Sequence, residues 1–325
     1  MVFRSGPNAP GVAFITGGAR GLGNAIAVSF SKEGSRGVVL VDIQDEKTFA
    51  EGKANVEKYG AKCLAIRADV TKEADVERAI AEAVNEFGRI DYAANFAGII
   101  GPLGNTWDIS LRDWQRVIDV NTIGLWLCNK HLLRQMMKQE SIEHRPPQRG
   151  SIVNCASVNS IQAGAGTTGY SASKHAVMGI TKAAALEARS HGIRVNAVSP
   201  GFLLTKLLDD FMKPEGGTTS PDDVWEKYEA RQGRKATYDE IGDVVVLLSL
   251  PRMSLVVGHN LVIDGYVILH IVDSVAPTGP AKFADQMRAI TDFFPFQEGL
   301  QLTRMRSDLR AITRVVGRHW GLAVK

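Results

Sequence analysis

Short apolar runs alternate with longer amphipathic stretches along most of the chain. Most of the apolar runs are continuous, and the stretches between them repeat apolar positions with helical spacing. Continuous apolar strands separated by helices are typical of a parallel sheet that helices cover on both faces. The pattern therefore predicts an α/β fold with a doubly wound parallel sheet.

The same pattern predicts where the elements lie. Strands are expected at residues 12–15, 38–41, 62–67, 90–95, 151–156, 194–198 and 260–263. Helices are expected at residues 22–32, 47–59, 74–87, 111–140, 170–190 and 238–250.

Two regions depart from this alternation. Residues 203–237 contain several prolines and glycines and are too long for a simple connection, so we interpret them as a lid over a pocket. Residues 267–325 follow the last expected strand and have only moderate helical character. We therefore divide the chain into a main domain of residues 1–266 and a C-terminal extension, residues 267–325, of unknown role.

Charge and composition exclude several classes of partner. Residues 1–266 carry 30 basic and 30 acidic residues, which argues against nucleic-acid binding. No apolar run approaches the roughly 18 residues of a membrane span, and no apolar segment precedes the first strand, so we expect neither a membrane partner nor a secretory signal. The three cysteines have no metal-ligand spacing and no paired framework, which indicates a reducing, cytoplasmic location and no metal site.

A glycine-rich loop joins the first strand to the first helix. Its candidate binding residues are Thr16, Gly17, Arg20, Gly21, Leu22 and Gly23. Glycines at this spacing permit a tight turn and a close approach of a pyrophosphate to backbone N–H groups, and the helix N-terminus favours the negative charge. This strand–loop–helix context favours a dinucleotide-binding loop over a plain turn.

Two charged residues bear on the choice of cofactor. Asp42 ends the second strand, 19 residues beyond Gly23, where a carboxylate accepts hydrogen bonds from the adenosine ribose and repels a 2′-phosphate. Arg20 points the other way, because a guanidinium in the loop can pair with that phosphate. We rank Asp42 above Arg20 and expect NAD, with NADP as the alternative.

Polar and small residues also follow the third and fourth strands. Asp69 and Val70 end the third strand, where an adenine ring would lie. Asn95, Ala97 and Gly98 end the fourth, where small residues let a ribose and nicotinamide pass close to the backbone. Asn95 is equally interpretable as a structural residue at a strand end.

Tyr170 and Lys174 are the most informative pair for catalysis. They lie four residues apart at the start of a helix, so both side chains project from one face, and the ammonium stabilises a phenolate for acid–base chemistry. Ser157 ends a strand 13 residues before Tyr170, where its hydroxyl can bind a substrate oxygen. Asn121 is a poor helix former inside an expected helix, which indicates a buried role such as binding a water in a proton path.

Together these motifs resemble those of the short-chain dehydrogenase/reductase family. The matching pieces are Thr16-Gly17-x-x-x-Gly21-x-Gly23, Asp69, Asn95-x-Ala97-Gly98, Asn121, Ser157, Tyr170-x-x-x-Lys174, Pro200-Gly201-x-x-x-Thr205, and Gly258 with residues 262–265. They occur in the family's order and spacing over residues 10–265. The resemblance implies a single Rossmann-like domain that carries out hydride transfer.

The resemblance also implies roles for individual residues. Tyr170 would be the general acid and base, and Lys174 would assist it and hold the nicotinamide ribose. Ser157 would polarise the substrate oxygen, and Asn121 would anchor a water that links Lys174 to solvent. The residues implied around the nicotinamide amide and the phosphates, after the sixth strand, are Pro200, Gly201, Leu203 and Thr205.

Two residues depart from the family pattern. Phe96 stands where a second asparagine or a small residue is usual, and Tyr266 stands where a second glycine is usual. Family members usually end near that point, and in many of them the final strand helps to form a subunit interface. We therefore expect a homo-oligomer whose assembly the extension alters, unless the extension reflects an unusual gene model.

Apolar and aromatic residues near the expected pocket indicate the substrate class. They are Trp107, Phe202, Leu207, Leu208, Phe211, Trp225 and Tyr228. Such residues suit an apolar, ring-containing substrate, and packing of the lid against the body explains them equally well. The hypothesis is hydride transfer between a nicotinamide cofactor and a hydrophobic secondary alcohol or ketone, in specialised metabolism. The alternatives are a non-catalytic NAD(H)-binding sensor or assembly protein, and an enzyme impaired by the extension.

Overall fold

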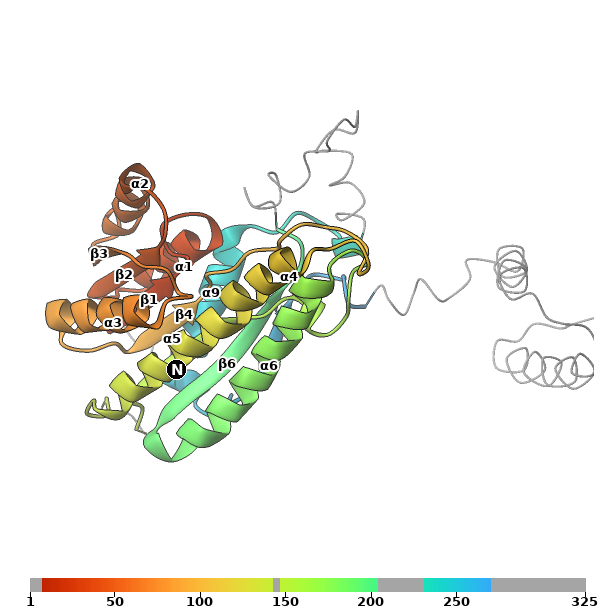
Figure 1. Cartoon of the computed structure of the whole chain (residues 1–325). Coiled ribbons are helices and arrows are strands. Elements are labelled where there is room, and N and C mark those ends of the chain that lie inside the picture. Colours follow the sequence, from red (N-terminus) through yellow and green to blue (C-terminus); the bar gives the residue numbers. More distant parts are fainter. Residues whose placement is uncertain (1–7, 143–146, 204–230, 270–325) are drawn as a thin grey trace, which may run out of the picture. The chain divides into compact units, whose positions relative to one another are not determined.

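The computed structural model describes residues 8–142, 147–203 and 231–269 (Figure 1). These residues lie in the first of two compact units into which the chain divides, Met1–Ile271. Seven parallel strands form its sheet, in the order β3-β2-β1-β4-β5-β6-β7. The predicted doubly wound parallel sheet is confirmed. The strands are β1 (Val12–Thr16), β2 (Gly37–Asp42), β3 (Lys62–Arg67), β4 (Tyr92–Asn95), β5 (Gly150–Cys155), β6 (Ile193–Pro200) and β7 (Asn260–Ile263).

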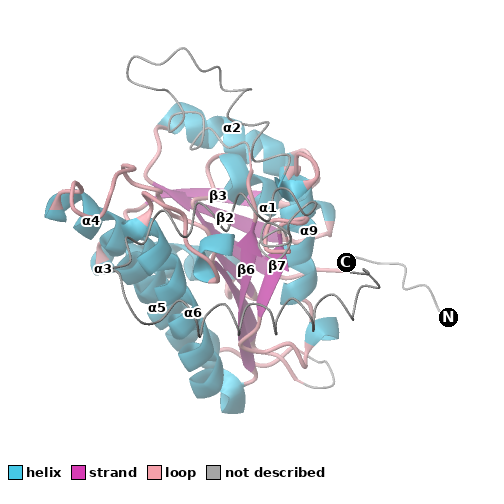
Figure 2. Ribbon diagram, turned by 90° about the vertical axis from the view of Figure 1, so that its right-hand side faces the viewer, coloured by secondary structure: helices cyan, strands magenta, loops and turns pink. Residues whose placement is uncertain are grey.

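Helices cover both faces of this sheet (Figures 1 and 2). Helices α1, α2 and α9 pack on one face, and α3, α5 and α6 pack on the other. Their bounds are α1 (Gly21–Lys32), α2 (Glu46–Glu57), α3 (Glu73–Phe87), α4 (Leu111–Ile118), α5 (Leu125–Met137), α6 (Thr168–Ala188) and α9 (Tyr238–Ser249). Shorter turns are η2 (Val158–Ser160), η3 (Arg189–His191) and η4 (Pro251–Met253). In the part of the chain that is described, no helix has the length and apolar character needed to cross a bilayer.

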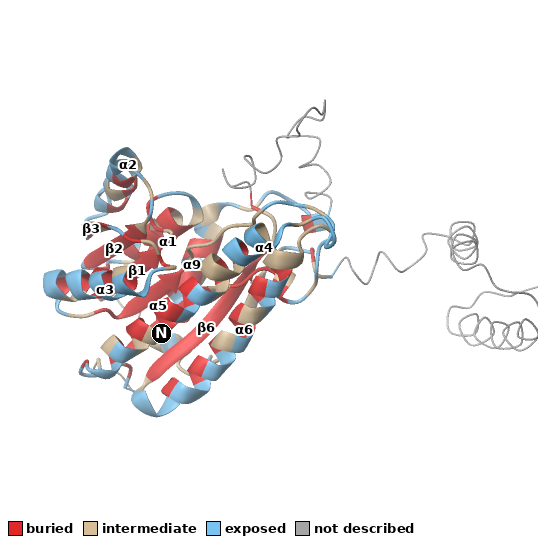
Figure 3. Cartoon of the chain, viewed as in Figure 1, coloured by how far each residue is buried: buried red, intermediate tan, exposed pale blue. Residues whose placement is uncertain are grey.

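Alternate residues of the central strands face the two helical layers. In β1, Val12 and Phe14 belong to the core beneath α3, α5 and α6, whereas Ala13 and Ile15 belong to the core beneath α1, α2 and α9. Figure 3 shows the buried sheet between helices whose outer faces are exposed. The apolar runs are continuous because both faces of each central strand are buried.

Two of the three thiols lie inside these cores. Cys63 in β3 and Cys128 in α5 are buried. Burial raises the pKa of each thiol to about 12, because the apolar surroundings disfavour the thiolate. Cys155, at the end of β5, is half-buried, and all three cysteines are free.

The stretch expected as one helix at residues 111–140 is interrupted. It consists of α4, a π-helical turn η1 (Asp119–Gly124) and α5, which ends at Met137. Asn121 lies buried in that turn, and its side-chain amide bonds to both backbone groups of Ile99. A π turn accommodates a local break in the i→i+4 pattern, and here it coincides with the residue that bonds to the loop after β4.

Strand β4 starts at Tyr92, two residues later than expected. The N–H and C=O of Ile90 are both bonded to the side-chain amide of Gln139, each at 2.9 Å, and not to a neighbouring strand. Ile90, which the apolar pattern assigned to the strand, therefore forms its backbone hydrogen bonds with Gln139, a side chain that follows α5.

The described fold continues past the expected domain boundary at residue 266. Val267 is fully buried, and the Ile268 N–H donates to Asp264 Oδ2 at 2.9 Å. Residues 204–230, which make up most of the expected lid, and residues 270–325 of the extension lie outside the described residues.

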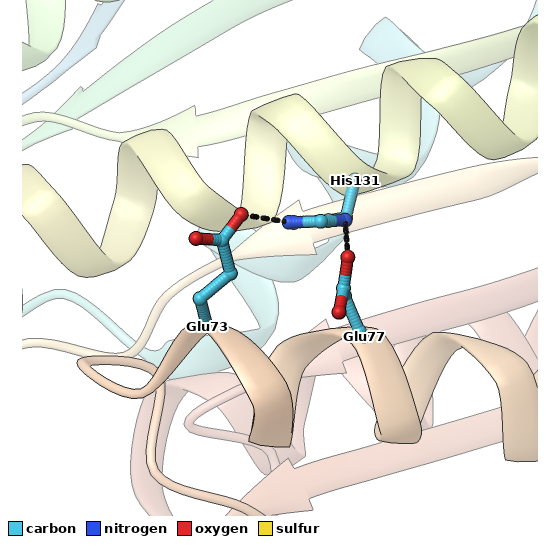
Figure 4. A group of neighbouring side chains, drawn as sticks. All are labelled: Glu73, Glu77 and His131. Carbon is cyan, nitrogen blue, oxygen red and sulfur yellow. Dashed lines mark hydrogen bonds and ion pairs between the residues drawn. The ribbon is translucent and has the colours of Figure 1, made fainter.

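A charged cluster joins α3 to α5 (Figure 4). His131 Nε2 lies 2.8 Å from Glu73 Oε1, and Nδ1 lies 3.4 Å from Glu77 Oε1. Hydrogen bonds from Lys130 and His131 hold the pKa of Glu73 below its usual value. Two carboxylates and an imidazole are also ligand types for a divalent cation. Here each ring nitrogen lies beside a carboxylate and Lys130 pairs with Glu73, so these side-chain contacts link α3 to α5.

We expect Glu240→Gln to destabilise the protein at neutral pH and to have less effect in acid. Glu240 pairs with Arg234 and closes the capping box of α9 with Thr237, and these contacts, Arg234 first, lower its pKa to about 2. The folded pKa is below the unfolded value of about 4.3, so the stabilisation is present above that value and is lost as pH falls toward 2. Urea unfolding of both proteins at pH 7 and pH 3 measures the difference, and a difference that does not shrink at pH 3 contradicts this explanation.

Candidate active site

The carboxyl ends of β1 and β4 form the centre of the site. These strands are neighbours, and the chain leaves them toward opposite faces, which opens a crevice at this edge of the sheet. The Thr16 hydroxyl accepts hydrogen bonds from the N–H groups of Phe96 and Ala97 at 3.1 and 3.2 Å. Gly17 has a φ of 69°, and a Cβ there would lie 2.9 Å from Ala97 N. Only glycine fits where the two predicted cofactor segments touch.

The N-terminus of α1 is open to an anion. Its N-cap residue, Arg20, makes no side-chain capping bond, and its first turn holds no acidic residue. Gly21 has nothing within 4 Å of the position that a Cβ would take, whereas Leu22 packs on the core and Gly23 lies against the Gly17 carbonyl. Unbonded N–H groups, the helix dipole and open space together fit the diphosphate of a dinucleotide.

Asp42 lies beside this loop, as predicted. Its Oδ2 accepts from the Ala19 N–H at 3.1 Å, and its Oδ1 accepts from the Ile43 N–H at 2.8 Å. Each oxygen retains a lone pair for a ribose hydroxyl. Arg20 is exposed, and the ion pairs found among the described residues do not join it to Asp42. The Asp42 carboxylate is therefore fixed beside the loop, and the Arg20 side chain is exposed to solvent.

Asp69 and Val70 form the turn between β3 and α3. Asp69 Oδ1 accepts from the Thr71 hydroxyl at 2.7 Å and from the Thr71 N–H at 3.0 Å. The Asp69 N–H donates to Asp75, and this bond is the main cause of an Asp75 pKa below its usual value. Val70 is buried against Gly124 of the π turn. Both residues lie at the expected edge of the sheet, where they also have structural contacts.

The structure brings Tyr170 and Lys174 together on one turn of α6. Lys174 Nζ lies 5.5 Å from the centre of the Tyr170 ring and donates to the Cys155 C=O at 2.8 Å. Lys174 is only 4% exposed. Because a carbonyl at the end of β5 fixes the ammonium, its position relative to the phenol is fixed as well.

Asn121 and Lys174 converge on Gly98. Asn121 Oδ1 accepts from the Ile99 N–H at 2.9 Å, and its Nδ2 donates to the Ile99 C=O at 2.8 Å and to Ser173 Oγ at 3.0 Å. A Cβ on Gly98 would lie 3.2 Å from Asn121 Oδ1 and 3.8 Å from Lys174 Nζ. The amide thus positions the loop after β4 beside the helix that carries the tyrosine and lysine.

Ser157 lies after β5 and caps the turn η2. Its hydroxyl accepts from the Asn159 N–H at 3.2 Å, and the residue is buried. Asn159 Nδ2 donates in turn to Ser171 Oγ at 3.2 Å, next to Tyr170. The serine segment is therefore tied to the first turn of α6. Asn159 and Ser173 were not predicted from the sequence, although Ser173 lies inside the Tyr170–Lys174 motif.

Asn95 points into a buried polar network. Its Nδ2 donates to Asn154 Oδ1 at 2.9 Å, and Asn154 also bonds to Asn129 of α5 and Thr181 of α6. This network joins β4 and β5 to two helices beneath the site. Of the two interpretations left open for Asn95, these contacts favour the structural one, and Ala97 is the neighbour that faces the glycine loop.

The end of β6 lies at the same end of the sheet as those of β1 and β4. Pro200 is the last residue of this strand, and the Gly201 N–H donates to the Ile263 C=O at 2.9 Å. Leu203 is buried. Thr205 lies outside the described residues.

A small hollow of mixed polar and apolar lining adjoins Tyr170. Its lining comes from the loop after β4, from α4 and from the start of α6. The apolar part is Ile100, Pro102, Ile109, Trp114 and Val117, and the polar part includes Asp113, Thr167 and Thr168. Trp107 is 82% exposed and not part of this lining. Of the other residues expected to contact substrate, Phe202 is half-buried, and Leu207, Leu208, Phe211, Trp225 and Tyr228 lie outside the described residues.

Known proteins resemble this chain over the same region. Residues 17–266 match the family model described as Enoyl-(Acyl carrier protein) reductase. Short-chain dehydrogenase fogB of Aspergillus ruber is 37% identical over 265 residues, which cover 78% of this chain and 96% of that protein. (+)-Borneol dehydrogenase 2 of Salvia officinalis is 36% identical over 264 residues, which cover 78% and 88%. The structure of carveol dehydrogenase from Mycobacterium avium in complex with NAD matches with a TM-score of 0.74 at 27% identity, covering 82% of this chain and 100% of that chain.

Gly98→Ala is expected to reduce turnover by roughly tenfold to a hundredfold, because small displacements of reacting groups have effects of that size. The added methyl would lie 3.2 Å from Asn121 Oδ1, close enough to displace that amide, whereas its 3.8 Å distance to Lys174 Nζ is an ordinary contact. Gly179→Ala on α6 is the control, because nothing lies within 4 Å of its Cβ position. Turnover and melting temperature are measured for both variants, and full activity of Gly98→Ala would show that this convergence has no catalytic importance.

Proposed function

Because this chain belongs to the short-chain dehydrogenase/reductase family, we propose that it transfers a hydride between a nicotinamide cofactor and a hydrophobic secondary alcohol or ketone. The observation that carries the proposal is the Tyr170–Lys174 pair, which the Cys155 carbonyl fixes at the same end of the sheet as an open dinucleotide loop. A nicotinamide cofactor, when bound, supplies or accepts the hydride. The protein supplies binding, orientation and proton transfer.

The proposed proton transfer takes place at the Tyr170 hydroxyl. During ketone reduction the phenol donates its proton to the substrate oxygen, and during alcohol oxidation the phenolate accepts it. Lys174 stabilises the phenolate electrostatically, and a hydrogen bond to the Cys155 carbonyl holds the Lys174 ammonium in position. Ser157 donates a hydrogen bond to the same substrate oxygen. Asn121 positions the loop at Gly98 and, through the free lone pair of its Oδ1, accepts a bond from a water that connects Lys174 to solvent.

The apolar side chains of the hollow beside Tyr170 suit a hydrophobic substrate, and its polar side chains, such as Asp113 and Thr167, leave room for a polar group on it. Trp114 packs against Gly169, directly before Tyr170, and Trp114 and Tyr170 line the same hollow. Two similar proteins are named for borneol and carveol, which are cyclic alcohols. We therefore propose a cyclic, largely apolar secondary alcohol or ketone of specialised metabolism. Turnover of a panel of cyclic ketones, linear ketones and small keto acids tests this class, and a preference for the keto acids would contradict it.

Asp42 supports NAD as the cofactor, and Arg20 keeps NADP as the alternative. The carboxylate is fixed where the adenosine ribose is expected, so a 2′-phosphate there would meet a negative charge. A similar structure was solved with NAD.

We also propose a homo-oligomer in a reducing compartment such as the cytoplasm. Strand β7 is at the edge of the sheet, and Leu255 and Val257 just before it are exposed. Exposed apolar side chains beside an edge strand suit burial against a second copy. Three free cysteines suit a reducing environment.

The second candidate function is a non-catalytic NAD(H)-binding sensor or assembly protein. Tyr170→Phe distinguishes it from the enzyme. This variant is expected to lose at least about a hundredfold in turnover, because the proton donor is removed, while cofactor affinity stays within about twofold. Tyr59→Phe is the matched control, because Tyr59 is an exposed surface tyrosine. Wild-type protein that binds cofactor but turns over none of the panel would favour the sensor.

The wild-type protein is expected to bind NADH more tightly than NADPH, and Asp42→Asn is expected to narrow this preference by about tenfold. Asp45→Asn is the control, because it removes a negative charge three residues away and retains a side chain that can cap α2. This variant is expected to keep the wild-type preference for NADH over NADPH. Fluorescence titration with both cofactors measures the ratio. Tighter binding of NADPH by the wild type would assign the dominant role to Arg20.

A further inference from the structure

The side chain of Gln232 bonds to both backbone groups of Phe202. The Phe202 N–H donates to Gln232 Oε1 at 2.7 Å, and Gln232 Nε2 donates to the Phe202 C=O at 3.0 Å. The same Nε2 donates to the Arg234 C=O at 3.0 Å. The amide therefore has three hydrogen-bond partners within the protein. Gln232 is 3% exposed, so its side chain has almost no contact with water.

These bonds extend the hydrogen bonding of the sheet beyond its last strand pair. The pairing of β6 with β7 ends at Pro200 and Ile263, and the Gly201 N–H makes the last bond to β7. Phe202 is the next residue, and the Gln232 amide stands where a neighbouring strand would be. Buried backbone groups require such partners, which makes this amide a structural continuation of β7.

Two glycines leave the space that Gln232 fills. A Cβ on Gly201 would lie 2.5 Å from Gln232 Oε1, and a Cβ on Gly265 would lie 2.3 Å from the Gln232 carbonyl oxygen. Gly201 follows β6 and Gly265 follows β7. The ends of both strands are therefore shaped around one buried glutamine.

We propose that Gln232 is a positioning residue for the nicotinamide end of the site, an inference that rests on the function proposed above. Its amide fixes the backbone of Gly201 and Phe202, and through them the start of the segment at Leu203. Those backbone groups lie at the edge of the sheet where the nicotinamide amide is expected. Gln232 acts through Phe202 and not by touching the cofactor.

The chain contains a matched control for this arrangement. Gln139 bonds to both backbone groups of Ile90, each at 2.9 Å, and is buried as well. Ile90 precedes β4, so this second pairing lies at the amino ends of the strands, opposite to the glycine loop. The two glutamines therefore form the same pair of backbone hydrogen bonds, Gln232 at the carboxyl ends of the strands and Gln139 at the amino ends.

The experiment compares Gln232→Leu with Gln139→Leu. Both substitutions remove a pair of bonds to the backbone of one residue. Gln232→Leu also removes the bond to Arg234, and Gln139→Leu also removes bonds to Arg149 and Gln135. Both leave side chains of similar size, so both are expected to lower the melting temperature. Only Gln232→Leu is expected to weaken binding of NADH or NADPH, whichever the wild type prefers, by about tenfold. Hydrogen exchange of the unliganded protein is expected to speed up at the Phe202 amide in Gln232→Leu and to stay unchanged there in Gln139→Leu.

The outcomes separate this inference from the proposed function. Wild-type protein that binds neither cofactor would refute the proposed function and the inference with it. Wild-type protein that binds, with Gln232→Leu binding within about twofold of it or Gln139→Leu losing as much affinity, would refute the inference alone. If Gln232→Leu is insoluble, Gln232→Glu replaces it, because a carboxylate accepts from the Phe202 N–H but cannot donate to its C=O. An unchanged affinity of that variant would equally refute the inference.

Discussion

Buried backbone groups lose their ladder partners where a strand of the sheet ends, and this protein's site depends on how those groups are bonded. At the end of β1 the Thr16 hydroxyl accepts the N–H groups of the connection that follows β4. At the end of β5 the Cys155 carbonyl accepts a hydrogen bond from the Lys174 ammonium. Beyond β4 and β6, the amides of Asn121 and Gln232 each bond to both backbone groups of one residue. The side chains that bond to backbone groups at the carboxyl ends of the strands thereby fix the positions of the candidate catalytic residues.

The sequence was sufficient for the elements that depend on local pattern. The strands followed from continuous apolar runs, because helices cover both faces of the sheet. The convergence of Tyr170 and Lys174 followed from their spacing, because four residues on a helix face the same side. Asp42 was predicted to end the second strand and does so, and it lies beside the glycine loop because the carboxyl ends of neighbouring parallel strands share one end of the sheet.

The features that the sequence did not predict depend on contacts between distant segments. Asn121 bonds to a backbone 22 residues away and Gln232 to one 30 residues away. No periodicity reports such pairs, so the π turn at Asn121 was read as an uninterrupted helix and Gln232 was not noticed. Asn95 shows the same limit, because the contact that favours its structural interpretation is with Asn154, 59 residues away on the next strand.

The thiols of Cys63 and Cys128 give the sheet an internal reporter. Both remain protonated at physiological pH because burial raises their pKa values to about 12, and a thiol reacts with electrophiles mainly as its thiolate. Alkylation at these two positions therefore requires that the packed layers first separate. Its rate measures how often this domain opens, and ligands that hold the layers together slow the modification in proportion to their binding.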